Sequence, residues 1–158
     1  MIQKKSSHLD AEGQLKMVDV GEKKVTQRIA RAAALLIATP ETVEAIWSHQ
    51  LPKGDALTTA KIAGIQAAKQ TSHLIPMCHT LLLDMVDLSF ERTSDGIQIQ
   101  SEVRLSGKTG AEMEALSAVT VAALTLYDMA KSVQKDMVIT NTRLIFKDGG
   151  KNGKYQNV

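Results

Sequence analysis

The chain has 158 residues, and its 19 Lys and Arg against 17 Asp and Glu leave a formal net charge of +2 at pH 7. This length predicts a single compact domain over residues 1–158, and so small a charge argues against the strongly basic domain typical of nucleic-acid binding. One cysteine, Cys78, excludes an intrachain disulfide and a multi-cysteine metal site, and with no apolar run longer than residues 32–38 it predicts a cytoplasmic chain without a membrane span.

The first half of the chain predicts one strand followed by two helices. Apolar residues at odd positions of 25–38 favour a long strand, although the alanines there also suit a helix. Pro40 favours a first helical turn, and a short helix is expected over 41–49. Asp55 is a candidate N-cap for a second helix that runs to about residue 70.

The second half predicts a hairpin, a long helix and a last strand. Strands are expected over 82–90 and 97–105, the latter with clean apolar and polar alternation. The Asp-Gly pair within 93–96 favours a hairpin turn between them. Residues 110–131, rich in Ala, Leu, Met and Glu, form the strongest helix pattern, and 143–146 predicts the last strand.

The order of these elements is βαββαβ with a short inserted helix. It predicts an α+β, ferredoxin-like fold, in which an antiparallel sheet carries both main helices on one face. Apolar residues on three of the four strands predict association through the helix-free face. The two ends, 1–16 and 148–158, are expected to be a flexible N-terminal arm and a flexible Gly/Lys tail, although such a tail can also close over an anionic ligand.

Two loops carry candidate chemistry. Lys53 precedes a glycine and a helix start, where an ammonium and free backbone N–H groups can meet an anion; a solvated lysine is the plainer interpretation. Cys78 and His79 follow a proline at the entrance to a strand, and histidine suits proton transfer near neutral pH, although it can equally be structural. Adjacent Cys78 and His79, with only His73 nearby, do not indicate a metal site.

Residues 106–114 contain a Gly-Lys-Thr triplet that leads into the long helix. A P-loop would need a glycine five residues before this triplet, where the chain has Glu102, so no P-loop is present. Lys108 remains a candidate phosphate contact near a helix start. Glu112 and Glu114 lie in the first turn, where they complement the helix dipole whatever their function.

Asp128 and Lys131 lie three residues apart near the end of the same helix, as a functional pair or a surface ion pair. Glu114 and Asp128 are fourteen residues apart, which places them within about 40° of one face but about 21 Å apart along the axis. One small-molecule pocket cannot readily span that distance. If both ends of the helix serve one active site, a second subunit must complete it.

Long motifs agree together along this chain. Taken in order, they closely resemble the cyclic pyranopterin monophosphate synthase family, also known as the molybdenum cofactor biosynthesis protein C family. The resemblance runs from about residue 17 to residue 153, and MCHT at 77–80 replaces the commoner LCHP of the family. The motifs are MVDV at 17–20, KGD at 53–55, AKIAGIQAAK at 60–69, LIPMCH at 74–79, GKTGAEMEAL at 107–116 and YDMAKSVQKDM at 127–137.

This resemblance implies a lyase that converts 3′,8-cyclo-7,8-dihydro-GTP into cyclic pyranopterin monophosphate and pyrophosphate. It also implies a homohexamer built as a trimer of dimers, with active sites between subunits, and a functional link to a radical-SAM GTP cyclase that supplies the substrate. No redox cofactor is needed, while Mg²⁺ could accompany the triphosphate or pyrophosphate. The alternative is a binding module, for example a nucleotide sensor, that keeps the pocket without turnover.

The resemblance also implies the roles of individual residues. Asp128 matches the family's catalytic residue, Lys131 is its neighbour, and Lys53 is expected to face the same site. Either Arg28 or Arg31 is expected to add a basic contact. The residues implied to bind substrate are Met77, Cys78, His79, Glu112, Met113 and Glu114.

Overall fold

The computed structural model describes residues 8–151 and 153–157. Its main sheet has five strands in the order β2-β3-β1-β4-β5, and all neighbouring strands are antiparallel. The strands are β1 (Thr26–Ile37), β2 (Met85–Thr93), β3 (Gly96–Gly107), β4 (Val138–Asp148) and β5 (Tyr155–Gln156). The four longer strands have the order of a ferredoxin-like sheet, which confirms the predicted fold class.

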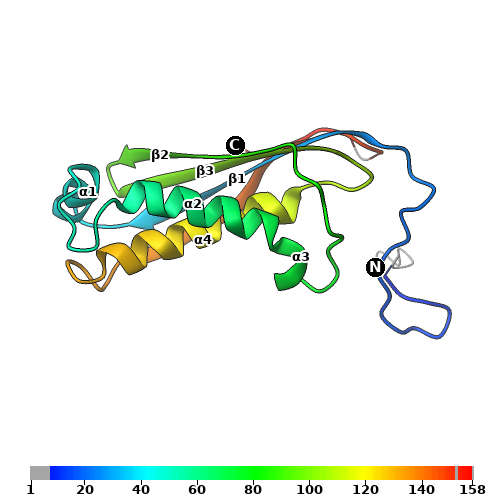
Figure 1. Cartoon of the computed structure of the whole chain (residues 1–158), viewed down its shortest axis with the longest axis horizontal. Helices are drawn as coiled ribbons and strands as arrows, with labels where there is room; N and C mark the ends of the chain where they lie inside the picture. Colours follow the sequence, from blue (N-terminus) through cyan, green and yellow to red (C-terminus); the bar gives the residue numbers. More distant parts are fainter. Residues whose placement is uncertain (1–7, 152, 158) are drawn as a thin grey trace.

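Four helices accompany the sheet: α1 (Pro40–Trp47), α2 (Ala56–Lys69), α3 (Thr71–Leu74) and α4 (Glu112–Ala130). Helices α2 and α4 lie side by side across one face, with α1 at one end of the molecule and α3 toward the other (Figure 1). Both longer predicted helices are therefore confirmed within about two residues. The order βαββαβ is also confirmed, with α1 as the short inserted helix.

The core lies between the sheet and these two helices, and it is built largely from small residues. Every second residue of β1 from Ala30 to Leu36 is fully buried, which settles the strand alternative for 25–38. Helices α2 and α4 meet through alanines, and a Cβ added to Gly64 would lie 2.6 Å from a Leu88 side-chain carbon and 2.9 Å from the Ala118 carbonyl oxygen. The glycine therefore sets how closely α2 approaches its neighbours.

Helix α4 is long and apolar enough to cross a membrane by length and composition alone. It packs on α2 and on three strands, and its alanines and Leu126 are fully buried in the protein core. Its apolar character therefore belongs to the core of this fold.

The helix-free face of the sheet is more polar than the apolar residues of the strands predict. In β3 the apolar residues Ile97, Ile99 and Val103 are buried beneath the helices, and strict alternation turns the residues between them to the other face. That face includes Glu102, which forms an ion pair with Arg31 of β1. The apolar residues counted in the sequence thus belong mostly to the core.

Candidate active site

The C-terminal end of α4 gathers the predicted catalytic residues into one cluster, here called the lysine–aspartate cluster: Lys53, Asp128 and Lys131. The ammonium of Lys53 lies 2.7 Å from Oδ2 of Asp128, and that of Lys131 lies 2.7 Å from Oδ1. Lys53 also donates to the backbone carbonyl of Asp128 at 3.0 Å. Two cations therefore hold one carboxylate, and one of them also binds a carbonyl at the helix end.

The charges of this cluster are fixed by the contacts. Hydrogen bonds from Lys131 and then from Lys53 lower the pKa of Asp128 to about 2. The same contact with Asp128 raises the pKa of Lys131. At neutral pH Asp128 is an anion and Lys131 an ammonium, so only the lysine can supply a proton.

The N-terminal end of α4 forms a small pocket of about 190 Å³. Helix α4 and the loop that follows α3 build it together, and it contains all six residues implied to bind substrate. Its lining residues are Met77, Cys78, His79, Leu81, Thr109, Gly110, Glu112, Met113 and Glu114.

Glu114 is a buried acid in the lining of the small pocket. It is only 4% exposed. Burial, and then the nearby charge of Glu112, raise its pKa to about 7. At neutral pH this carboxyl group therefore exchanges between the protonated and ionised forms, which suits either proton transfer or a hydrogen bond to a polar ligand.

Cys78 and His79 have different environments within the small pocket. Burial, and then the charge of Glu114, raise the pKa of the Cys78 thiol, so it is protonated at neutral pH and unsuited to nucleophilic attack. Nε2 of His79 lies 2.8 Å from the carbonyl oxygen of Val18. A carbonyl only accepts, so Nε2 carries the proton and the segment around Val18 orients the ring.

A larger basic pocket of about 550 Å³ adjoins the small pocket and shares Thr109, Gly110 and Glu112 with it. The start of β1, the end of β4 and the segments before β1, after β3 and after β4 contribute its cations. Lys147 pairs with Glu112 at 2.7 Å, and Lys108 donates to the carbonyl of Gly21 at 2.5 Å. The basic residues that line the pocket are Lys23, Lys24, Arg28, Lys108, Lys147 and Lys151.

Arg28 and Arg31, left as alternatives by the sequence, take separate places. Arg28 lines the basic pocket and donates to the carbonyl of Gly149 at 3.0 Å. Arg31 pairs with Glu102 on the helix-free face, away from both pockets at the start of α4. The backbone of the tail packs directly on Arg28, since a Cβ at Gly150 would lie 1.7 Å from its guanidinium nitrogen. Geometry thus favours Arg28 as the basic contact.

The lysine–aspartate cluster and the small pocket lie at opposite ends of α4. Figure 1 shows this helix running along the sheet, with the end of α4 near α1 and its beginning near α3. Glu114 and Asp128 are separated by fourteen residues of continuous helix, or about 21 Å. Within one chain, the residues of each predicted group therefore lie together, but the two groups lie at opposite ends of α4.

Sequence reasoning found both groups but missed most of the basic pocket. The sequence predicts a role in ligand binding for Lys108 and for Arg28, but it predicts none for Lys23, Lys24 and Lys147. The Lys-Lys pair before β1 was the available signal. The tail residue Lys151 also lines the pocket.

Comparison with known proteins now supplies a family. The model of the MoaC family matches residues 17–150. The chain belongs to the MoaC family. A relative from Oleidesulfovibrio alaskensis, named cyclic pyranopterin monophosphate synthase, is 50% identical over 152 residues, which cover 95% of this chain and 96% of the relative. A relative of the same name from Nitratidesulfovibrio vulgaris is 51% identical over 152 residues, which cover 95% of this chain and 94% of the relative.

Membership of the MoaC family agrees with the resemblance carried by the motifs. The matched residues include both ends of α4. The matched region contains the lysine–aspartate cluster, the small pocket and most of the basic pocket. Lys151, β5 and the arm before residue 17 lie outside it.

Proposed function

We propose that this chain is a cyclic pyranopterin monophosphate synthase of molybdenum cofactor biosynthesis. It would convert 3′,8-cyclo-7,8-dihydro-GTP into cyclic pyranopterin monophosphate and release pyrophosphate. The observation that carries the proposal is the gathering of all nine implied site residues into two compact groups, in a chain about 50% identical to relatives of that name.

The phosphates of the substrate would enter the basic pocket. Its six Lys and Arg side chains suit a triphosphate, and Glu112 is already paired with Lys147. The adjoining small pocket would take the purine-derived ring system, because it offers apolar methionines beside polar groups on Glu114 and His79. The shared wall formed by Thr109 and Gly110 would place the sugar between the two pockets.

The lysine–aspartate cluster would handle protons and charge. Closing the cyclic phosphate forms a bond from a substrate hydroxyl to the α-phosphorus and breaks the bond to pyrophosphate, which leaves with its electron pair. The step balances when Lys131 gives a proton to the departing pyrophosphate and the proton lost by the hydroxyl restores the charge of Lys131. Lys131, charged at neutral pH, is suited to donate a proton or stabilise the leaving group, while ionised Asp128 orients both lysines.

The separation along α4 supports a site shared between subunits. We assign the small and basic pockets to one chain and the lysine–aspartate cluster to another, in a homohexamer arranged as a trimer of dimers. Each chain would then contribute to two sites, one at each end of α4.

The remaining assignments follow from the same activity. A radical-SAM GTP cyclase would supply the cyclised substrate, and the enzyme would work in the cytoplasm. Any Mg²⁺ would accompany the phosphates, since the carboxylates beside the basic pocket, Glu112 and Asp148, do not make a dedicated cage. No catalytic step above depends on a metal ion or on a redox cofactor.

The test is turnover by the purified full-length chain given the cyclised substrate. The proposal predicts equimolar pyrophosphate and cyclic pyranopterin monophosphate, and a loss of at least about 100-fold in kcat for Asp128→Asn. Asp136→Asn, a change of an exposed aspartate beyond the same helix, is the matched control and should retain activity. Binding of substrate without either product would instead establish a binding module, and full activity of Asp128→Asn would remove the assigned catalytic centre.

A further inference from the structure

The loop between α1 and α2 determines where Lys53 points. Leu51 is buried and anchors the middle of this loop. Gly54, with a positive φ of +93°, donates its backbone N–H to the carbonyl of Leu51 at 3.0 Å and closes a turn around Lys53. The lysine side chain leaves this turn toward the end of α4. Its position therefore depends on what holds the two ends of the loop.

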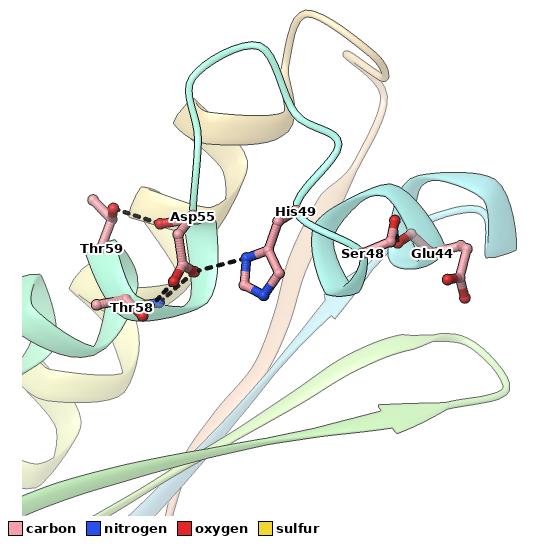
Figure 2. Close-up of polar contacts among 6 residues, drawn as sticks. All are labelled: Glu44, Ser48, His49, Asp55, Thr58 and Thr59. Atoms are coloured by element: carbon pink, nitrogen blue, oxygen red, sulfur yellow. Dashed lines mark hydrogen bonds and ion pairs between the residues drawn. The ribbon is translucent and has the colours of Figure 1, made fainter.

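One carboxylate contacts both ends. Asp55 accepts the backbone N–H of Thr58 at 3.0 Å and the hydroxyl of the same residue at 2.6 Å, which fixes the start of α2. Nδ1 of His49, at the other end of the loop, lies 3.5 Å from Oδ1 of Asp55. Figure 2 shows these side chains converging, with His49 reaching back from the end of α1.

Asp55 does more than cap a helix, because it also contacts the far end of the loop. Thr39, the N-cap of α1, makes the same paired contact with the backbone N–H and the hydroxyl of Thr42, so the two contacts of Asp55 with Thr58 are those of an ordinary cap. The contact with His49 goes beyond this cap, because it joins the start of α2 to the residue that follows the end of α1. The left-handed backbone of His49, with φ of +56°, is a usual conformation just past the end of a helix.

The other end of the arrangement is equally specific. The ammonium of Lys53 binds both the carboxylate and the backbone carbonyl of Asp128, so one side chain makes two contacts between the loop and α4. A shift of about 1 Å in the loop would break one of these contacts, and misplacement on this scale can cost about 100-fold in rate.

We propose that Asp55 is a positioning residue for Lys53: its carboxylate clamps the loop between His49 and Thr58, so that the Lys53 ammonium meets Asp128. For turnover, this inference rests on the proposed function. It does not make Asp55 a catalytic residue, since the carboxylate acts on the loop that carries Lys53. The plainer alternative is that Asp55 only caps α2.

Three variants separate positioning from capping. Asp55→Ala removes both the cap and the clamp, whereas His49→Asn removes the imidazole from the clamp, keeps the cap of α2 and tolerates the left-handed backbone at this position. Thr39→Ala removes the corresponding cap of α1, which does not carry Lys53. Loss of either cap costs about 1 kcal/mol of stability, so the two alanine variants are matched in helix damage.

The main readout is the rate of reductive methylation of Lys53 in the full chain, measured by mass spectrometry against exposed Lys135 as an internal reference. Asp128→Asn defines the rate when the charged partner is lost. Positioning predicts that Lys53 in Asp55→Ala is labelled nearly as fast as in Asp128→Asn. His49→Asn should also speed the labelling of Lys53, whereas Thr39→Ala should keep the slow labelling of the unaltered chain. Slow labelling in His49→Asn would mean that Asp55 acts only as the cap of α2. Unchanged labelling in Asp55→Ala overturns the proposal, whatever the activity.

Turnover is a second readout, and it can fail independently of the labelling. Asp55→Ala should lower kcat by about 10-fold or more and leave KM within about two-fold, because phosphate and ring contacts lie elsewhere. His49→Asn should lower kcat in the same direction and again leave KM within about two-fold. If the unaltered chain has no turnover, the proposed function fails while the labelling still decides the positioning role. Equal loss of kcat in Asp55→Ala and Thr39→Ala would identify general helix damage and contradict positioning.

Discussion

At the scale of one residue, Glu114 shows how burial raises the pKa of a carboxyl group. In the unfolded chain its carboxyl ionises near pH 4.5, whereas in the folded chain its pKa is about 7. Sequence identified the residue from its motif but not this property, because the desolvation comes from packing around the start of α4. The first turn of any helix favours an acid, so position alone predicted only a dipole contact.

The raised pKa predicts a specific loss of stability. Between about pH 4.5 and 7 the unfolded chain releases a proton that the folded chain retains, so stability falls as pH rises, by about 3 kcal/mol for one such group. Glu114→Gln should remove this fall, and Glu91→Gln, at an exposed position, should keep it. Urea unfolding at pH 5 and pH 8, at one protein concentration, measures the difference. Equal pH dependence in all three proteins would contradict the assignment.

Lys108 carries a prediction about substrate binding. It lines the basic pocket at the end of β3, and we assign that pocket to the phosphates. Lys108→Ala should raise KM by about 10-fold, which corresponds to about 1.4 kcal/mol, and the effect should shrink at high salt. Lys135→Ala, outside the pocket, is the control. If KM is unchanged at low salt, the phosphates bind at another surface and the assignment of the basic pocket is contradicted.

At the scale of elements, predictability followed the regularity of each pattern. Alternation in β3 was unbroken, so its strand and its buried face could be predicted. The last strand was expected only at 143–146 but spans Val138–Asp148, because the pairing of β1 with β4 shifts register twice and Asn141 has a positive φ. Such irregularities hide the two-residue period. The short strand β5 lies in the predicted tail and has too few residues to show any period.

The contact between α2 and α4 gives a test at this scale. Gly64→Val would place methyl groups where Leu88 and Ala118 already lie, and overpacking of this kind costs about 1–3 kcal/mol. Gln66→Val, an exposed change on the same helix, carries the same β-branched penalty without the clash. Thermal unfolding should show a clearly larger loss for Gly64→Val. Equal losses would mean that the helices can separate at no cost.

At the scale of the whole molecule, the length of α4 connects the fold to the proposed reaction. Sequence could predict the members of the two groups because each member lies in a short motif of the family that the chain resembles, and this resemblance alone related Lys53 to Asp128. It could not predict the basic pocket as a unit, because Lys23, Lys108 and Lys147 come from three segments that only the sheet brings together. Under the proposed function, a second chain is required to join the two groups into one site.

Mixing two inactive variants tests this shared site most directly. His79→Ala damages the small pocket, and Asp128→Asn damages the lysine–aspartate cluster, so each homomeric protein should be inactive. After the two are unfolded together and reassembled, random pairing in a two-fold dimer leaves about one quarter of the sites with both halves intact. A shared site predicts that turnover of the cyclised substrate returns to about one quarter of the unaltered level. No recovery, in a mixture shown to exchange subunits, would contradict an active site built from two chains.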